Sequence, residues 1–127
     1  MLAVFPDVPD ETLEQVLDTG STEFVPFVID HGLGPIWHAR LGRAEFHASR
    51  MAAESMYLAQ QRALANIDAA LNEAGIAYAI IKGAANRLLL HDNPAVRAGY
   101  DIDLLVHPDD RMHTAQLLIR QGYSAHP

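Results

Sequence analysis

The longest stretch of this sequence without glycine or proline runs from about Ala44 to Ala74, and it is rich in alanine. Both properties favour a helix, because glycine and proline are the residues that most often end one. Apolar side chains recur at helical spacing and form one stripe, made of Met56, Tyr57, Ala63, Leu64, Ile67, Ala70 and Leu71. Gly75 follows as a typical C-cap. The stretch therefore predicts one long helix whose apolar stripe packs into a core.

Three shorter helices are predicted upstream of the long one, each bounded by capping or breaking residues. They run from Asp10 to about Asp18 before Gly20, from Thr22 to about His31 before Gly32 and Gly34, and from Pro35 through Trp37 to Leu41. We therefore interpret residues 1–75 as a helical N-terminal region.

The pattern changes after Gly75, where short apolar segments alternate with helical ones. The predicted order is a strand at Ile76–Ile81, a helix at Ala84–Leu90, a strand at Asp101–Val106 and a helix from Pro108 or Asp109 to about Gln121. The unbroken apolar half of the second strand indicates burial on both faces, and Tyr123-Ser124 would begin a third strand. The fold class is therefore mixed α/β (α+β), a helical region followed by a partial β-α-β-α core at residues 76–127.

The overall composition limits the kinds of partner. The chain has 127 residues, of which 50% are hydrophobic, so it can bury a core. Its net charge of −7 argues against broad electrostatic binding to nucleic acid or to an anionic membrane. Cysteine is absent, no apolar run approaches the roughly 18 residues of a membrane span, and the N-terminus lacks the pattern of a signal peptide. We therefore expect a soluble, cytoplasmic protein.

Asp101 and Asp103 stand one residue apart at the start of the second predicted strand. Because side chains alternate across a strand, both carboxylates would face the same side, about 6.5–7 Å apart. Two like charges in such a place are costly unless a cation or a proton relieves them. Mg²⁺ binds to one or two carboxylates together with phosphate oxygens. The pair thus predicts a divalent metal site, and the alternative is two unrelated acids at a solvated strand end.

Lys82-Gly83 follows the first predicted strand, and Arg97 precedes the second. A glycine between a strand and a helix lets a phosphate approach the N–H groups at the helix N-terminus. Together with the aspartates, these residues match the parts needed for metal-assisted nucleotidyl transfer. Alternatively, Lys82 is an ordinary exposed strand end, and Arg97 forms a structural ion pair with one of the aspartates.

Four segments follow one another along the chain: Phe27 to Trp37, Ile81-Lys82-Gly83-Ala84-Ala85 with Arg97, Asp101-Ile102-Asp103-Leu104-Leu105-Val106, and Gln121-Gly122-Tyr123. In this order they resemble the uncharacterised nucleotidyltransferase family of the polymerase-beta-like superfamily. The resemblance covers roughly residues 24–124.

The resemblance implies that Gly83 shapes a phosphate loop and that Asp101 and Asp103 are catalytic residues that coordinate a divalent metal such as Mg²⁺. It implies three more residues close to the nucleotide: Lys82, Ala84 and Arg97. Ala84 is a departure, because superfamily members often carry serine or glycine at that position. A hydroxyl contact to phosphate is therefore lost here.

The resemblance also implies a third carboxylate on a later strand, which active superfamily members usually carry. After Asp103, however, the only acids are Asp109 and Asp110, at the start of a predicted helix. The core thus looks incomplete, and three explanations stay open: the sequence is a shortened form, a second copy completes it in a homodimer, or the chain binds without catalysing.

The activity that the resemblance implies is Mg²⁺-dependent transfer of a nucleoside monophosphate from an NTP to an acceptor. The residues do not specify the acceptor, which is a small molecule, a peptide or a protein. The alternative is a non-catalytic nucleotide-binding or protein-interaction module, for which the long alanine-rich helix offers a partner face.

Overall fold

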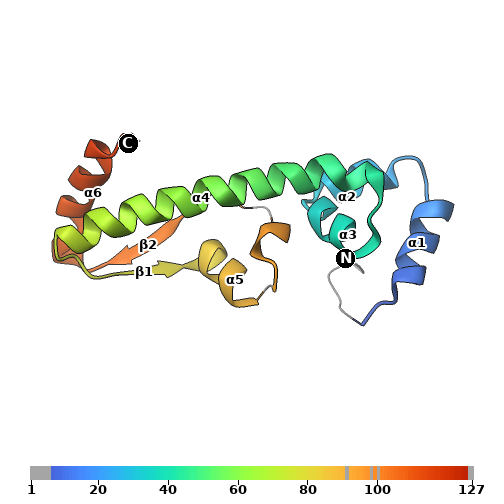
Figure 1. Ribbon diagram of the computed structural model, residues 1–127, viewed down its shortest axis with the longest axis horizontal. Coiled ribbons are helices and arrows are strands. Elements are labelled where there is room, and N and C mark those ends of the chain that lie inside the picture. Colours follow the sequence, from blue (N-terminus) through green and yellow to red (C-terminus); the bar gives the residue numbers. More distant parts are fainter. Residues whose placement is uncertain (1–6, 91, 98, 100, 126–127) are drawn as a thin grey trace. The chain divides into compact units, whose positions relative to one another are not determined.

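A computed structural model describes residues 7–90, 92–97, 99 and 101–125. The helices are α1 (Asp10–Thr19), α2 (Phe24–Asp30), α3 (Gly34–Leu41), α4 (His47–Glu73), α5 (Lys82–Leu90) and α6 (Arg111–Arg120). Short 3₁₀ turns lie at η2 (Ala44–Phe46), η3 (Pro94–Val96) and η4 (Pro108–Asp110), and the strands are β1 (Tyr78–Ile81) and β2 (Asp103–Val106) (Figure 1). The expected α+β class with a helical N-terminal region is confirmed.

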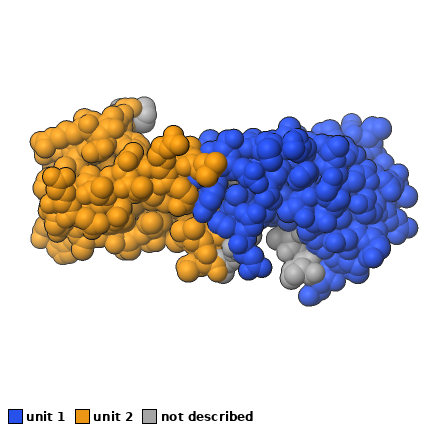
Figure 2. Space-filling view, in the orientation of Figure 1, with its two compact units in different colours: residues 1–57, 91–99 blue, residues 58–90, 100–127 orange. Residues whose placement is uncertain are grey.

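The chain divides into two compact units, which Figure 2 shows in different colours. Unit 1 contains residues 1–57 and 91–99, and unit 2 contains residues 58–90 and 100–127. Helix α4 therefore belongs to unit 1 up to Tyr57 and to unit 2 from Leu58. The division into a helical region at 1–75 and a core at 76–127 stays a prediction. Across the described residues, none of the helices combines the length and apolar character that crossing a membrane requires.

Unit 1 is held by an aromatic core between its helices. Four buried side chains form its centre, namely Leu13, Val28, Trp37 and Phe46. The rings of Trp37 and Phe46 meet edge to face with their centroids 5.9 Å apart, an arrangement that aromatic pairs prefer. Trp37 is thus a core residue of unit 1.

Arg43 connects α1 to the 3₁₀ turn η2 within unit 1. Its guanidinium donates hydrogen bonds to Glu14 at 2.8 Å, to Asp18 at 2.9 Å and to Glu45 at 2.8 Å. The hydrogen bond from Arg43 lowers the pKa of the Glu45 carboxyl below its ordinary value. One arginine therefore neutralises acids from two elements that are far apart in the sequence.

We expect Arg43→Met to destabilise unit 1 at neutral pH and to lose this effect in acid. Because the pKa of Glu45 is lowered in the folded state, its contribution is fully present above the ordinary glutamate pKa and disappears as the pH falls through the lowered value. Fluorescence of Trp37, the single tryptophan of the sequence, reports on unit 1 during urea unfolding. If the wild type and Arg43→Met differ in unfolding free energy by the same amount at neutral and at acidic pH, the ion pairs of Arg43 do not stabilise unit 1.

The long helix predicted from alanine content and helical spacing is confirmed. Its first predicted turn is the separate 3₁₀ turn η2, and α4 itself runs from His47 to Glu73. Gly75 has a positive φ of 69°, a conformation that glycine adopts without steric cost. The N–H of Ile76 donates to the carbonyl of Leu71 at 2.9 Å, which closes the helix end as a Schellman motif does.

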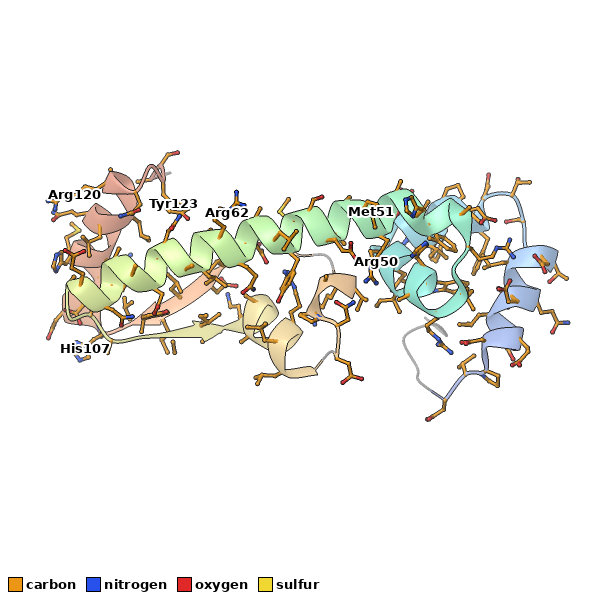
Figure 3. All side chains as sticks on the ribbon, in the orientation of Figure 1. Arg50, Met51, Arg62, His107, Arg120 and Tyr123 are labelled. Atoms are coloured by element: carbon orange, nitrogen blue, oxygen red, sulfur yellow. The ribbon has the colours of Figure 1, made fainter. Side chains whose placement is uncertain are left out.

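Unit 2 packs a small sheet against the C-terminal part of α4. Ile67, Leu71 and Ile76 are buried at its centre. Side chains of both strands and of α6 pack around them, namely Tyr78, Leu104, Val106, Leu117 and Leu118. Arg62 projects from the side of α4 that faces away from the strands (Figure 3). The apolar stripe of the sequence is therefore core packing in this unit.

The two strands are antiparallel, and their register runs from Tyr78 opposite Val106 to Ile81 opposite Asp103. Two expectations about the second strand are wrong. β2 begins at Asp103, so Asp101 lies outside it, because β1 ends at Ile81 and offers no partner beyond that pair. Burial on both faces is also wrong, because Leu105 is 58% exposed on the side of the sheet away from the core.

The expectations for the first and third strands also differ from the structure. The first strand begins at Tyr78, two residues later than predicted, because Ile76 is still engaged in closing α4. Residues 123–125, where a third strand was expected to begin, are not in a strand. Gly122, with φ of 98°, ends α6 as predicted.

Candidate functional site

The candidate site lies where β1 ends and α5 begins. Ile81 is the last residue of β1 and stands opposite Asp103, the first residue of β2. Lys82 follows at once and has a φ of 56°, a conformation that side-chain-bearing residues seldom adopt. The chain therefore passes from strand to helix at a single strained residue. Backbone strain of this kind is often found at functional sites.

The Lys82 ammonium reaches across to the other strand. Its Nζ lies 3.4 Å from Oδ1 of Asp103, with the lysine side chain 71% exposed and the aspartate side chain 35% exposed. An exposed ion pair at this distance contributes little to stability. Asp103 thus already has a cation beside it, and the pair is weak enough for a metal ion or a phosphate to rearrange it.

We expect Lys82→Gly to be more stable than Lys82→Ala by about 1 kcal/mol. Both substitutions remove the ammonium, but only glycine relieves the left-handed backbone, which costs other residues about 1–2 kcal/mol. Thermal unfolding of the two variants side by side measures the difference. Equal stability of the two would mean that the backbone at this position is not strained.

Gly83 and Ala84 form the first turn of α5 with Lys82. A Cβ at Gly83 would meet no atom within 4 Å, so open space lies beside this glycine, whereas the Ala84 side chain is buried at 5% exposure. Ala84 can therefore contribute to a ligand only through its backbone. The first N–H groups of a helix lack partners within the helix and favour anions, so this turn suits a phosphate. The positive φ falls on Lys82 rather than on the glycine.

Asp101 and Asp103 occupy different structural positions. Asp103 is half-buried and fixed in the sheet, whereas Asp101 is exposed and lies two residues before the strand. Two carboxylates fit a Mg²⁺ ion that takes its remaining ligands from phosphate oxygens and water. Within the described ranges, no three or more His, Asp or Glu side chains gather closely enough to hold a metal by themselves. The donor set thus fits a metal whose remaining ligands are water or, when substrate is bound, phosphate oxygens.

Asp109 and Asp110 do not supply a third carboxylate. They lie in η4, which follows the end of β2 at Val106, whereas Asp103 is at its beginning. A strand of four residues spans roughly 10 Å between its ends. These acids are therefore at the wrong end of β2 to complete the candidate site.

A buried polar network lies beside the candidate site and was not predicted from the sequence. Arg87 of α5 and Gln60 of α4 are only 3% and 5% exposed. Arg87 donates from Nη1 to Oε1 of Gln60, and Gln60 donates from Nε2 to the backbone carbonyl of Asp101 at 3.3 Å. The sequence carried one indication that Gln60 is buried. Gln60 precedes Leu64 and Ile67 by four and seven residues, so it lies on the same face of the helix as the apolar stripe.

Arg97 follows η3 and is exposed. It belongs to unit 1, whereas Lys82, Gly83, Asp101 and Asp103 belong to unit 2. Its predicted place beside the nucleotide therefore stays a prediction. The cation observed beside Asp103 is Lys82.

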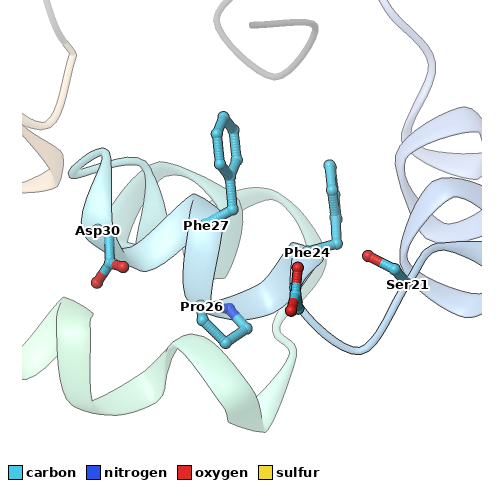
Figure 4. A pocket seen from close by; sticks show the side chains of 6 residues that line it. Ser21, Phe24, Pro26, Phe27 and Asp30 are labelled. Atoms are coloured by element: carbon cyan, nitrogen blue, oxygen red, sulfur yellow. The ribbon is translucent and has the colours of Figure 1, made fainter.

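A shallow depression on unit 1 contains none of these residues. It lies over α2 and is lined by Ser21, Glu23, Phe24, Pro26, Phe27 and Asp30 (Figure 4). The rings of Phe24 and Phe27 are stacked with centroids 6.3 Å apart. This surface is mainly apolar and carries two acids, so its chemistry differs from that of a phosphate site.

The turn at Lys82 thus combines a helix N-terminus, which favours anions, with a lysine and an aspartate, and Asp101 supplies a second carboxylate of the kind that Mg²⁺ prefers. The chain belongs to the uncharacterised nucleotidyltransferase family, whose family model matches residues 23–127. The resemblance drawn from its motifs over residues 24–124 is thereby confirmed. None of the curated proteins and none of the solved structures matches the chain. Membership of this family implies a nucleoside triphosphate as the class of substrate.

Proposed function

We propose that this protein transfers a nucleoside monophosphate from an NTP to an acceptor in a Mg²⁺-dependent reaction. The observation that carries the proposal is the contact between Lys82 and Asp103 across the end of the sheet. It brings a cation and a carboxylate to the N-terminus of α5, where an anionic phosphate is favoured. Family membership supports the nucleotidyltransferase class.

Each residue of the candidate site has a role in this proposal. The N–H groups of Gly83 and Ala84 bind the triphosphate, and the Lys82 ammonium offsets its charge. Asp101 and Asp103 would hold Mg²⁺, which neutralises charge on the phosphates and orients them when bound. Arg97 is assigned to the nucleotide on its motif alone.

The transfer itself is a displacement at the α-phosphorus. A nucleophilic oxygen or nitrogen of the acceptor forms a bond to this phosphorus, and the bond to the bridging oxygen of the β-phosphate breaks. Pyrophosphate leaves with the electron pair, and the acceptor's proton passes to solvent or to a nearby base. The acceptor is a small molecule, a peptide or a protein.

Two experiments test the proposal, first nucleotide binding and then turnover. The full chain is titrated with ATP, GTP, CTP and UTP separately, in excess Mg²⁺ and in excess EDTA, by calorimetry. We expect binding of at least one nucleotide that is stronger with Mg²⁺. Release of pyrophosphate, together with label from an α-labelled nucleotide on an acceptor in cell extract, then shows transfer. Equal or absent binding in Mg²⁺ and EDTA would refute the proposal.

A second candidate function is a nucleotide-binding module without catalysis. It is favoured by the position of Asp109 and Asp110 at the far end of β2, which leaves two carboxylates at the site within the described part of the chain. Binding without pyrophosphate release would support this module. The homodimer in which a second copy completes the sheet also stays a prediction, and sedimentation as a monomer at micromolar concentration would contradict it.

A further inference from the structure

Asp101 lacks the support that the sheet gives to Asp103. Asp103 is paired with Ile81 in the strand register, whereas Asp101 precedes the strand and makes no ladder pair. A metal ligand works only if its position is held to within a fraction of an ångström, which neighbouring groups ordinarily ensure. Something other than the sheet must therefore hold the backbone at Asp101.

Gln60 holds this backbone from the side of α4. Its Nε2 donates to the carbonyl oxygen of Asp101 at 3.3 Å, and the side chain is 5% exposed. This buried amide lies in register with the apolar stripe of α4, and its burial carries a desolvation cost that hydrogen bonds must offset. The hydrogen bond to the Asp101 carbonyl is therefore one of the interactions that offset the burial of Gln60.

Arg87 determines which end of the Gln60 amide faces Asp101. Because a guanidinium can only donate, its bond to Oε1 leaves the NH₂ group to face the carbonyl. Arg87 is also part of α5, the helix whose first turn is the candidate phosphate site. The hydrogen bonds from Arg87 to Gln60 and from Gln60 to Asp101 thus connect α5 to the segment that carries Asp101.

We propose that Gln60 and Arg87 are positioning residues for the metal ligand Asp101. The inference rests on the proposed function, since it concerns the same metal site. Gln60 fixes the Asp101 backbone so that its carboxylate meets the metal near that of Asp103, and Arg87 fixes the orientation of Gln60. Substitution of a residue that holds a metal ligand in place by a hydrogen bond typically lowers metal affinity 10-fold to 100-fold.

Gln60→Glu separates this role from packing, because it keeps the shape of the side chain. The carboxylate still accepts from Arg87, whose guanidinium favours its charged form. It has no hydrogen to donate to Asp101, so the carbonyl is left facing a negative charge. We therefore expect a folded protein with a misplaced metal ligand.

Titration of the isotope-labelled full chain with Mn²⁺ measures the effect without requiring turnover. Paramagnetic broadening of the amide signals of residues 102–104 reports metal at the site. We expect the Mn²⁺ concentration for half-maximal broadening to rise about 10-fold or more in Gln60→Glu. Gln61→Glu, the same change one residue along α4, supplies the matched control for added charge and should leave this concentration unchanged.

The outcomes separate the two proposals. Broadening in the wild type with an unchanged midpoint in Gln60→Glu overturns the positioning role and leaves the metal site intact. Absence of broadening at these residues in the wild type overturns the metal site and, with it, the positioning role. If Gln60→Glu does not fold, Gln60→Met decides, since it removes the hydrogen bonds to Arg87 and to the Asp101 carbonyl without adding charge. An unchanged midpoint in that variant overturns the inference.

Discussion

Replacing both aspartates, as Asp101→Asn with Asp103→Asn, is expected to abolish the Mg²⁺-dependent part of nucleotide binding. An amide is a poor substitute for a carboxylate as a ligand of Mg²⁺, which favours charged oxygen ligands. The proposed site offers two such ligands, so the double substitution leaves none. Binding that remains should be the same in Mg²⁺ and in EDTA, because the first turn of α5 and Lys82 are unchanged. Calorimetric titration of the nucleotide in both buffers measures this.

The matched control is Asp109→Asn with Asp110→Asn. It makes the same chemical change and the same change in net charge at the 3₁₀ turn η4, beyond the far end of β2. Mg²⁺-dependent binding should persist in this variant. If both double variants lose it equally, the loss comes from overall charge. If the Asp101 and Asp103 variant keeps it, the metal ligands lie elsewhere.

The candidate site could be predicted because most of its residues lie at the boundaries of successive elements. Lys82 and Gly83 follow the last residue of β1 and begin α5, and Asp103 begins β2. Their order along the chain is visible in the sequence, and antiparallel pairing brings Ile81 opposite Asp103. These element boundaries and a short motif therefore assigned Lys82 and Asp103 to one candidate site, and the two side chains are in contact.

The buried network beside the site could not be predicted in the same way. Gln60 lies 27 residues before Arg87 and 41 residues before Asp101. No local pattern specifies which residues at such separations form hydrogen bonds, because the pairing depends on how α4 and α5 pack. The polar residue on the apolar stripe indicated only that some partner was needed.

The starts of the strands were less predictable than the helix ends that a glycine marks. Gly75 and Gly122 end helices through their own conformation, with φ of 69° and 98°, so their effect is local. The start of β2 depends instead on where β1 stops, since a strand exists only as far as its partner does. Asp101 was therefore assigned to a strand that has no partner for it.

Leu71→Ala is expected to destabilise unit 2 by about 2–5 kcal/mol, the usual cost of such a cavity. Leu71 is fully buried, and its carbonyl accepts the hydrogen bond from Ile76 that closes α4. Removing the side chain leaves a cavity between α4 and the sheet that carries Asp103. Native-state hydrogen exchange of the β1 amides measures the loss within unit 2 itself, whereas Trp37 fluorescence reports on unit 1.

The same substitution at Leu58 provides the control, because Leu58 lies on the same helix and is 65% exposed. Leu58→Ala should change the opening free energy of β1 by no more than roughly 0.5 kcal/mol. Similar effects of the two substitutions would mean that helix propensity, not burial, dominates along α4. A large effect of Leu71→Ala alone would show that this core supports β1 and β2. Mg²⁺-dependent nucleotide binding should then weaken in Leu71→Ala, because the sheet that carries Asp103 opens more often. Leu71 itself has no role in the proposed mechanism.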